Sequence, residues 1–144
     1  MPGEVELARS VFGDRIDLSR VRLVRLPAFL KRAFVPGRFA GRSWICWPAG
    51  SWAGDLSLGS LKRRATFVHE LVHVWQAQQG VNLLIGKLRA GDGPKAYAYR
   101  CDADVKWARL NIEQQASVIE HRYLLAQGAT VPASEDFYRR VCPF

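Results

Sequence analysis

One stretch of the chain combines the residue types of a hydrolytic metal centre. In "FVHELVHVWQ" (67–76), His69 and His73 stand on either side of Glu70. On a helix, residues four apart share a face with a rise of about 6 Å between them, so two imidazoles can converge on one ion. Glu70 lies one step round the helix, where it can reach a water on that ion. The spacing therefore predicts two metal ligands and a general base on one rigid element.

A catalytic zinc site also needs a third protein ligand and an open coordination position. A motif with Gly at position 76 and His at position 79 would supply that ligand, but Gln76 and Gln79 stand there. The third ligand must then come from elsewhere in the chain. The alternatives that the residues leave open are Glu113, Glu120 and His121 and, more weakly, Asp102 and Asp104.

The helix that carries the two histidines is predicted from Ser60 to the residue before Gly80. Ser60 can cap its first turn, and Gly80 can end it. Apolar residues cover nearly its whole circumference, which is typical of a central, buried helix. Histidines on such a helix need partners, so the alternative to a metal site is a pair of buried, hydrogen-bonded histidines.

The region that carries the candidate third ligands is also predicted to be helical. It covers residues 101–128 and ends at Gly128. Asn111 can cap a fresh helix within it, because Gln114 follows three residues later in the capping-box position. A shorter helix is predicted over residues 134–141. A second helix packed on the first would bring both parts of a metal site together.

Two short strands are predicted ahead of the central helix. "RVRLVRL" (20–26) alternates apolar residues with arginines, and "RSWICWP" (42–48) is rich in aromatic and β-branched residues. A turn at Pro36 and Gly37 separates them. A loop is predicted after the helix, with Gly86, Gly91, Gly93 and Pro94. The order of elements favours an α+β fold in which a small sheet packs on the central helix.

Composition limits the class of protein. The 144 residues, 49% hydrophobic and 24% charged, are typical of one globular domain, and we expect a single domain over residues 1–144. No apolar run approaches the roughly 20 residues of a membrane span, so no membrane partner is expected. The polar start "MPGEVELARS" is not a secretory signal, which favours synthesis in the cytoplasm. Three cysteines without paired spacing predict free thiols: Cys46, Cys101 and Cys142.

The net charge of +8 comes from basic residues that are spread along the chain. No nucleic-acid-binding motif accompanies them, so a solvated basic surface is expected and a nucleic-acid partner is not. Lys62 and Arg63 fall in the first turn of the predicted helix, where positive charge opposes the helix macrodipole. The sequence gives no structural reason for that placement.

Two segments together resemble a known superfamily. "FVHELVHVWQ", followed about 40 residues later by "NIEQQA" (111–116), resembles the zincin-like metallopeptidases in their glutamate-ligand, gluzincin-like branch. More narrowly, the chain resembles short HExxH proteins called Vgr-related, which are encoded beside type VI and other contractile secretion systems. Those proteins carry a Tyr-x-Tyr between the two segments, and Tyr97 and Tyr99 stand here. The resemblance extends from about Arg22 to Tyr123.

The resemblance implies a site and a fold. His69, His73 and Glu113 would hold one Zn²⁺, with Glu70 as the base. The fold would be zincin-like, with a small sheet on the HExxH helix and a second helix supplying Glu113. Well-studied gluzincins often place an Asp one turn after the ligand Glu to orient a histidine, whereas this chain has Ser117.

Two further groups of residues can contribute to the predicted site. Tyr97, Tyr99 and Tyr123 are candidates to donate a hydrogen bond to an oxyanion, and Tyr99 is the one assigned; the alternative is an amphipathic core role. In zincins an edge strand beside the active helix can pair with an extended substrate. Trp44, Cys46 and their neighbours in "RSWICW" would then line a groove; the alternative is an ordinary sheet strand.

We therefore expect a zinc-dependent metallopeptidase that acts on a protein or peptide substrate. The resemblance implies a bacterial secretion or toxin setting, with secretion-system proteins as partners and export by a signal-independent machine. Two alternatives stay open. One is a non-catalytic zinc-binding interaction module of a secretion particle, which docks through its basic face. The other is a DNA-associated protease, suggested by the charge of +8.

Overall fold

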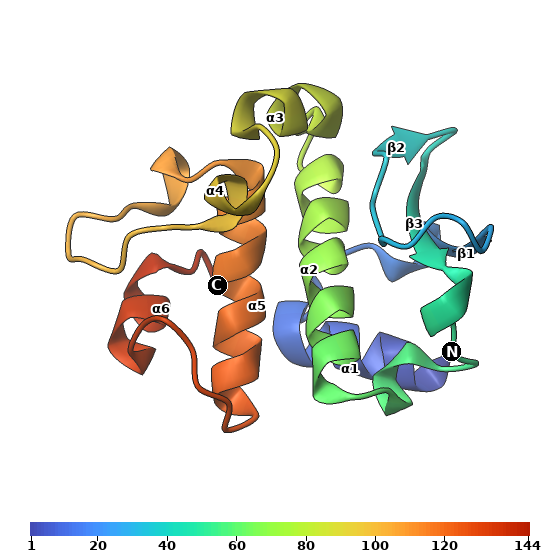
Figure 1. Ribbon diagram of the computed structural model, residues 1–144, viewed down its shortest axis with the longest axis horizontal. Helices are drawn as coiled ribbons and strands as arrows, with labels where there is room; N and C mark the ends of the chain where they lie inside the picture. The colour runs from blue at the N-terminus through green and yellow to red at the C-terminus, as the bar shows by residue number, and fades with distance from the viewer.

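A three-stranded sheet and six α-helices form a mixed α+β domain (Figure 1). The computed structural model describes residues 1–144. The helices and strands follow one another in this order: α1 (Pro2–Phe12), β1 (Val21–Leu26), β2 (Arg38–Phe39), β3 (Arg42–Pro48), α2 (Leu61–Gln78), α3 (Leu83–Ala90), α4 (Pro94–Tyr97), α5 (Ile112–Ala126) and α6 (Glu135–Val141).

Helix α2 lies in the middle of the molecule. Figure 1 shows the sheet on one side of it and α5, running alongside, on the other. Val68, Leu71 and Val72 are at most 1% exposed, because neighbours cover α2 on several sides. The prediction of a central, buried helix is confirmed, and Ser60 caps it by accepting a hydrogen bond from the Arg63 amide.

The strand β3 is the middle strand of the sheet, not an edge. It pairs in parallel with β1 and antiparallel with β2, and Phe34 forms a further bridge to Cys46. Both predicted strands are confirmed in position. Of the two interpretations of "RSWICW", an ordinary sheet strand is the one that agrees with the structure. An edge strand open to substrate pairing does not agree along the paired part, since neighbouring strands already use its backbone groups.

The start of α5 is held by the predicted capping box. The Asn111 side chain accepts from the Gln114 amide at 2.8 Å, and the Gln114 side chain accepts from the Asn111 amide at 3.0 Å. Each side chain satisfies a backbone N–H that has no partner inside the helix. The short helix predicted near the C-terminus is also present, as α6, with Ser134 as its cap.

Two predictions about the segment between α2 and α5 are wrong. Residues 83–90, predicted to be loop, form α3, and residues 101–110, predicted to be helical, contain only a short 3-10 turn at Trp107–Arg109. Gly86 lies inside α3, where a Cβ atom would stand 2.8 Å from the Ile112 side chain. That glycine therefore permits close packing of α3 on α5. Helix α1 was not predicted either.

Each helix is too short or too polar to cross a membrane. The three cysteines are free thiols, with Cys46 and Cys142 half-buried and Cys101 exposed.

Candidate metal centre

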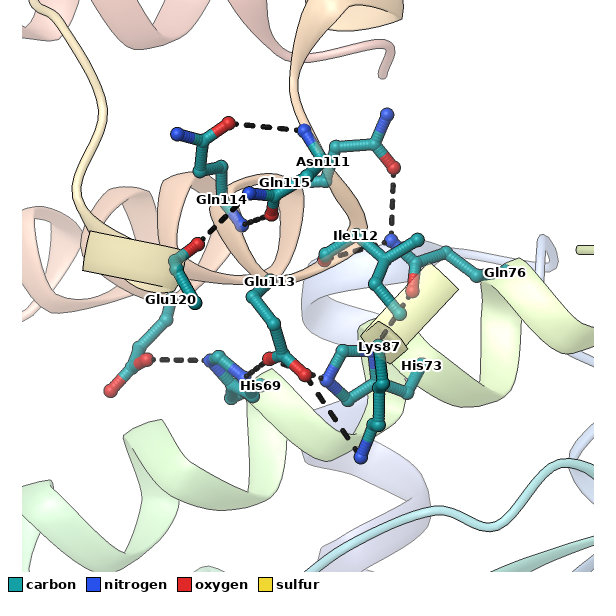
Figure 2. A network of polar contacts seen from close by, with 11 residues as sticks. His69, His73, Gln76, Lys87, Asn111, Ile112, Glu113, Gln114, Gln115 and Glu120 are labelled. Atoms are coloured by element: carbon teal, nitrogen blue, oxygen red, sulfur yellow. Dashed lines mark hydrogen bonds and ion pairs between the residues drawn. The ribbon is translucent and has the colours of Figure 1, made fainter. Parts of the chain in front are cut away.

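Helices α2 and α5 bring three metal-ligating side chains to one buried point. Glu113 Oε2 lies 3.2 Å from His69 Nε2 and 3.1 Å from His73 Nε2 (Figure 2). The three ligand atoms lie within 4.8 Å of one another, and all three residues are buried. Of the alternatives that the sequence left open for the third ligand, Glu113 is the one that the structure brings to both histidines.

The ring of His73 is oriented by Gln76. Gln76 Nε2 donates to the Ile112 carbonyl (3.1 Å) and to Gln115 Oε1 (2.9 Å), so its amide oxygen faces His73 Nδ1 at 2.9 Å. A carbonyl oxygen can only accept, hence Nδ1 carries the proton. Nε2 of the neutral ring then turns a lone pair toward Glu113.

The ring of His69 is oriented by Glu120. His69 Nδ1 lies 2.9 Å from Glu120 Oε2, and a carboxylate there again selects the tautomer with the proton on Nδ1 (Figure 2). Glu120, one of the alternatives for the third ligand, is therefore a partner of a histidine. Glu120 thus supplies a carboxylate that orients His69. The position one turn after Glu113 holds Ser117 instead of a carboxylate.

The arrangement fits a divalent cation. With neutral rings, two Nε2 lone pairs and a carboxylate oxygen face one another, and only a cation or protons can reconcile three acceptors. Two ligands of a tetrahedral zinc, each at 2.0–2.1 Å, stand roughly 3.3 Å apart. The distances of 3.2 Å and 3.1 Å from Glu113 to His69 and His73 are close to that separation.

The same charges shift the pKa values of the apo site. Burial alone lowers the pKa of His69, but the carboxylates of Glu113 and Glu120 outweigh it and raise the pKa to about 9. Burial alone raises the pKa of Glu113, but the two histidines outweigh it and hold it well below its usual range. In the absence of a metal, protons hold these groups together.

Glu70 lies beside the centre without a hydrogen-bond partner for one oxygen. Its side chain is buried, and Oε2 has no partner within the protein. Burial raises the pKa of Glu70, against the attraction of His73 and His69. A buried carboxylate with a raised pKa is a stronger base than an exposed one, which suits it to accept a proton.

A cavity of about 690 Å³ opens over His69 and Glu70. We call it the site pocket. The other residues that line it come from the loop after β1, the end of β3, the first turns of α2, and α4 and α5: Lys31, Arg32, Ala33, Trp47, Pro48, Ser51, Ser60, Lys62, Arg63, Thr66, Tyr97 and Glu120.

The structure does not bring Tyr99 to the site pocket. Its hydroxyl lies 2.6 Å from His121 Nδ1 and 3.0 Å from the hydroxyl of Tyr138. Tyr97, two residues earlier, lines the pocket, with its ring centroid 5.9 Å from that of His69. Tyr123 is buried in the main core. The Tyr-x-Tyr pattern contained the pocket tyrosine, but α4 ends at Tyr97 and turns only that one toward the centre.

The two residues that orient the histidines were not assigned that role from the sequence. Gln76 stands three positions after His73, and Glu120 stands seven after Glu113, so each lies on the same helix face as the ligand that it follows. That spacing could have identified Gln76 and Glu120 as neighbours of the candidate ligands. Lys87 is a further neighbour, with Nζ 3.9 Å from the second oxygen of Glu113.

Comparisons with known proteins define the family. No protein-family model matches the chain. The effector domain of Pseudomonas aeruginosa VgrG2b has a similar structure, with a TM-score of 0.72 and 35% sequence identity, covering 88% of this chain and 73% of that one. The chain therefore belongs to the family of that effector domain.

The same relative appears among full-length proteins. The type VI secretion system spike protein VgrG2b of Pseudomonas aeruginosa is 37% identical over 137 residues, which cover 85% of this chain. The chain spans 12% of the length of that spike protein.

Proposed function

We propose that this domain is a zinc metallopeptidase that hydrolyses peptide bonds. The observation that carries the proposal is the convergence of three acceptor atoms from His69, His73 and Glu113 beside a buried, unpartnered Glu70 oxygen. A zinc ion bound there supplies Lewis-acid chemistry, which polarises a carbonyl and acidifies a coordinated water. Three protein ligands leave a coordination position open, which favours a catalytic role over a structural one.

The residues of the chain have distinct roles in the proposal. Glu70 accepts the proton of the attacking water and passes it to the leaving amine. Glu120 and Gln76 keep the Nε2 atoms of the histidines free for the metal. Tyr97, on the pocket wall, donates to the oxygen that becomes negative during attack.

The architecture and the family support a zincin-like assignment in a secretion setting. A central helix with the HExxH residues, a sheet on one side and a helix with a glutamate ligand on the other is the arrangement expected of a gluzincin-like domain. The relative is a type VI secretion spike protein. We therefore assign this domain as a type VI effector that is exported with secretion-system proteins.

Metal analysis paired with a Glu70→Gln variant tests the proposal. The purified chain should hold about one zinc, His73→Ala should lose it, and Glu70→Gln should keep it. Glu70→Gln should lower the hydrolysis of a broad peptide library by about 10²–10⁴-fold, because proton transfer is lost and no ligand is removed. A zinc-loaded wild type that cleaves nothing in the library would favour a non-catalytic zinc module.

A further inference from the structure

The site pocket carries four basic side chains that have no ion-pair partner. Lys31 and Arg32 come from the loop after β1, and Lys62 and Arg63 come from the first turn of α2. None of the four takes part in an ion pair within the chain, although other arginines do. Unpaired charges of one sign around a cavity concentrate ligands of the opposite sign.

The acidic lining residues of the pocket belong to the candidate metal centre or its support. Glu70 and Glu120 are its acidic lining residues. Glu70 is buried beside the candidate metal centre, and Glu120 holds His69 at 2.9 Å. The four cations at the mouth are therefore not balanced by an acidic lining residue that is free to turn toward them. They can be neutralised by a ligand.

Lys62 and Arg63 lie at an electrostatically unfavourable place in helix α2. Helix α2 begins at Leu61, so both residues do lie in its first turn, where positive charge is unfavourable. The stem of Arg63 lies over Gly59, where a Cβ would stand 2.5 Å from Arg63 Cδ. This packing holds Arg63 along the pocket wall.

We propose that the site pocket is the substrate-binding cleft and that it selects a peptide segment with carboxylate side chains next to the scissile bond. The inference rests on the proposed function. The scissile amide would lie over His69, Glu70 and Tyr97, and the acidic side chains would lie along the rim that Lys31, Arg32, Lys62 and Arg63 form. A peptide can place separate charges at the rim and a neutral amide at the floor. A nucleic acid would bring a continuous row of phosphates to the two floor carboxylates.

Peptide binding to the full chain carrying Glu70→Gln, with zinc added, tests this inference without turnover. The probes are a labelled peptide of alternating Ala and Asp and its counterpart with Asn in place of Asp, measured by fluorescence anisotropy. The acidic peptide should bind at least about tenfold more tightly, and rising salt should reduce the difference, because exposed charges are screened. Lys62→Gln/Arg63→Gln should remove most of the preference.

The matched control removes one lysine and one arginine elsewhere. Arg9→Gln/Lys106→Gln changes the net charge equally at two exposed residues outside the site pocket, and it should keep the preference. Equal binding of the two peptides, an equal loss in both double variants, or tighter binding of a single-stranded oligonucleotide would overturn the inference. Hydrolysis by the wild type is scored separately, so a chain that cleaves without acidic preference refutes only this inference, and acidic preference without cleavage refutes only the proposed function.

Discussion

The proton on His73 is positioned through a series of side chains that ends at a backbone carbonyl. Gln115 Nε2 donates to the Trp107 carbonyl at 3.1 Å, which turns Gln115 Oε1 toward Gln76. Gln76 then offers its own oxygen to His73 Nδ1. Since each amide has a fixed acceptor, the whole series has one direction, and the neutral ring of His73 carries its proton on Nδ1. The sequence motif gives the ligand types but not this polarity.

Removal of Glu120 tests the orientation of His69. Glu120→Ala should lower the zinc affinity by about 10–100-fold, because the ring loses the partner that fixes its tautomer and position. Competition with a chromogenic chelator measures the change. Glu135→Ala, at an exposed glutamate of α6, is the control and should leave the affinity unchanged. Equal affinity for Glu120→Ala and wild type would refute the role.

The two neighbouring tyrosines should behave differently. Tyr97→Phe should lower kcat by about 10²–10³-fold with little change in KM, because a hydroxyl on the pocket wall is lost. Tyr99→Phe should leave kcat unchanged and lower the thermal midpoint instead, since its hydroxyl bonds His121 and Tyr138. Steady-state kinetics and thermal melts separate the two effects. A kcat loss confined to Tyr99→Phe would reverse the assignment.

At the scale of elements, a helix could be predicted where its own sequence carries the residues that cap it. Helices α2 and α5 have their caps in their own sequence, at Ser60 and Asn111, and both were predicted. Helix α3 was missed because glycine is typical of loops. Gly86 occurs inside α3 because it lies against Ile112, a residue of a different helix. The convergence of His69, His73 and Glu113 was predictable from the motif and the resemblance. The pocket tyrosine was not, because the choice between Tyr97 and Tyr99 depends on where α4 ends.

The positive charges in the first turn of α2 lower the stability of the folded chain. Each of Lys62 and Arg63 opposes the macrodipole by about 0.3–1 kcal/mol. Lys62→Gln/Arg63→Gln should therefore raise the thermal midpoint, by on the order of 2–6 °C for a chain of this size. Arg9→Gln/Lys106→Gln should shift it less. A lower midpoint for the α2 variant would show that these residues stabilise the fold, and the charge of the site pocket would then need another explanation.

At the scale of the molecule, the candidate centre joins its two halves. His69 and His73 belong to α2, which packs on the sheet, whereas Glu113 belongs to α5, which packs on α6. A metal that binds only the folded chain stabilises it by mass action, about 2.7 kcal/mol at a hundredfold excess over Kd. Zinc should raise the thermal midpoint of the wild type and leave that of His73→Ala unchanged. A chelator should reverse the shift.

The segment that connects those halves has a consequence for fragments of the chain. Gly91, Asp92 and Gly93 are exposed and lie between α3 and α4, away from the three ligands in the sequence. A protease site inserted there would give two pieces, one with both histidines and one with the glutamate. Zinc should keep the cleaved pieces together on a sizing column, and Glu113→Ala should let them separate. Under the proposed function, mixing the pieces with zinc should also restore peptide hydrolysis, so that hydrolysis would report the metal-dependent association of the two pieces.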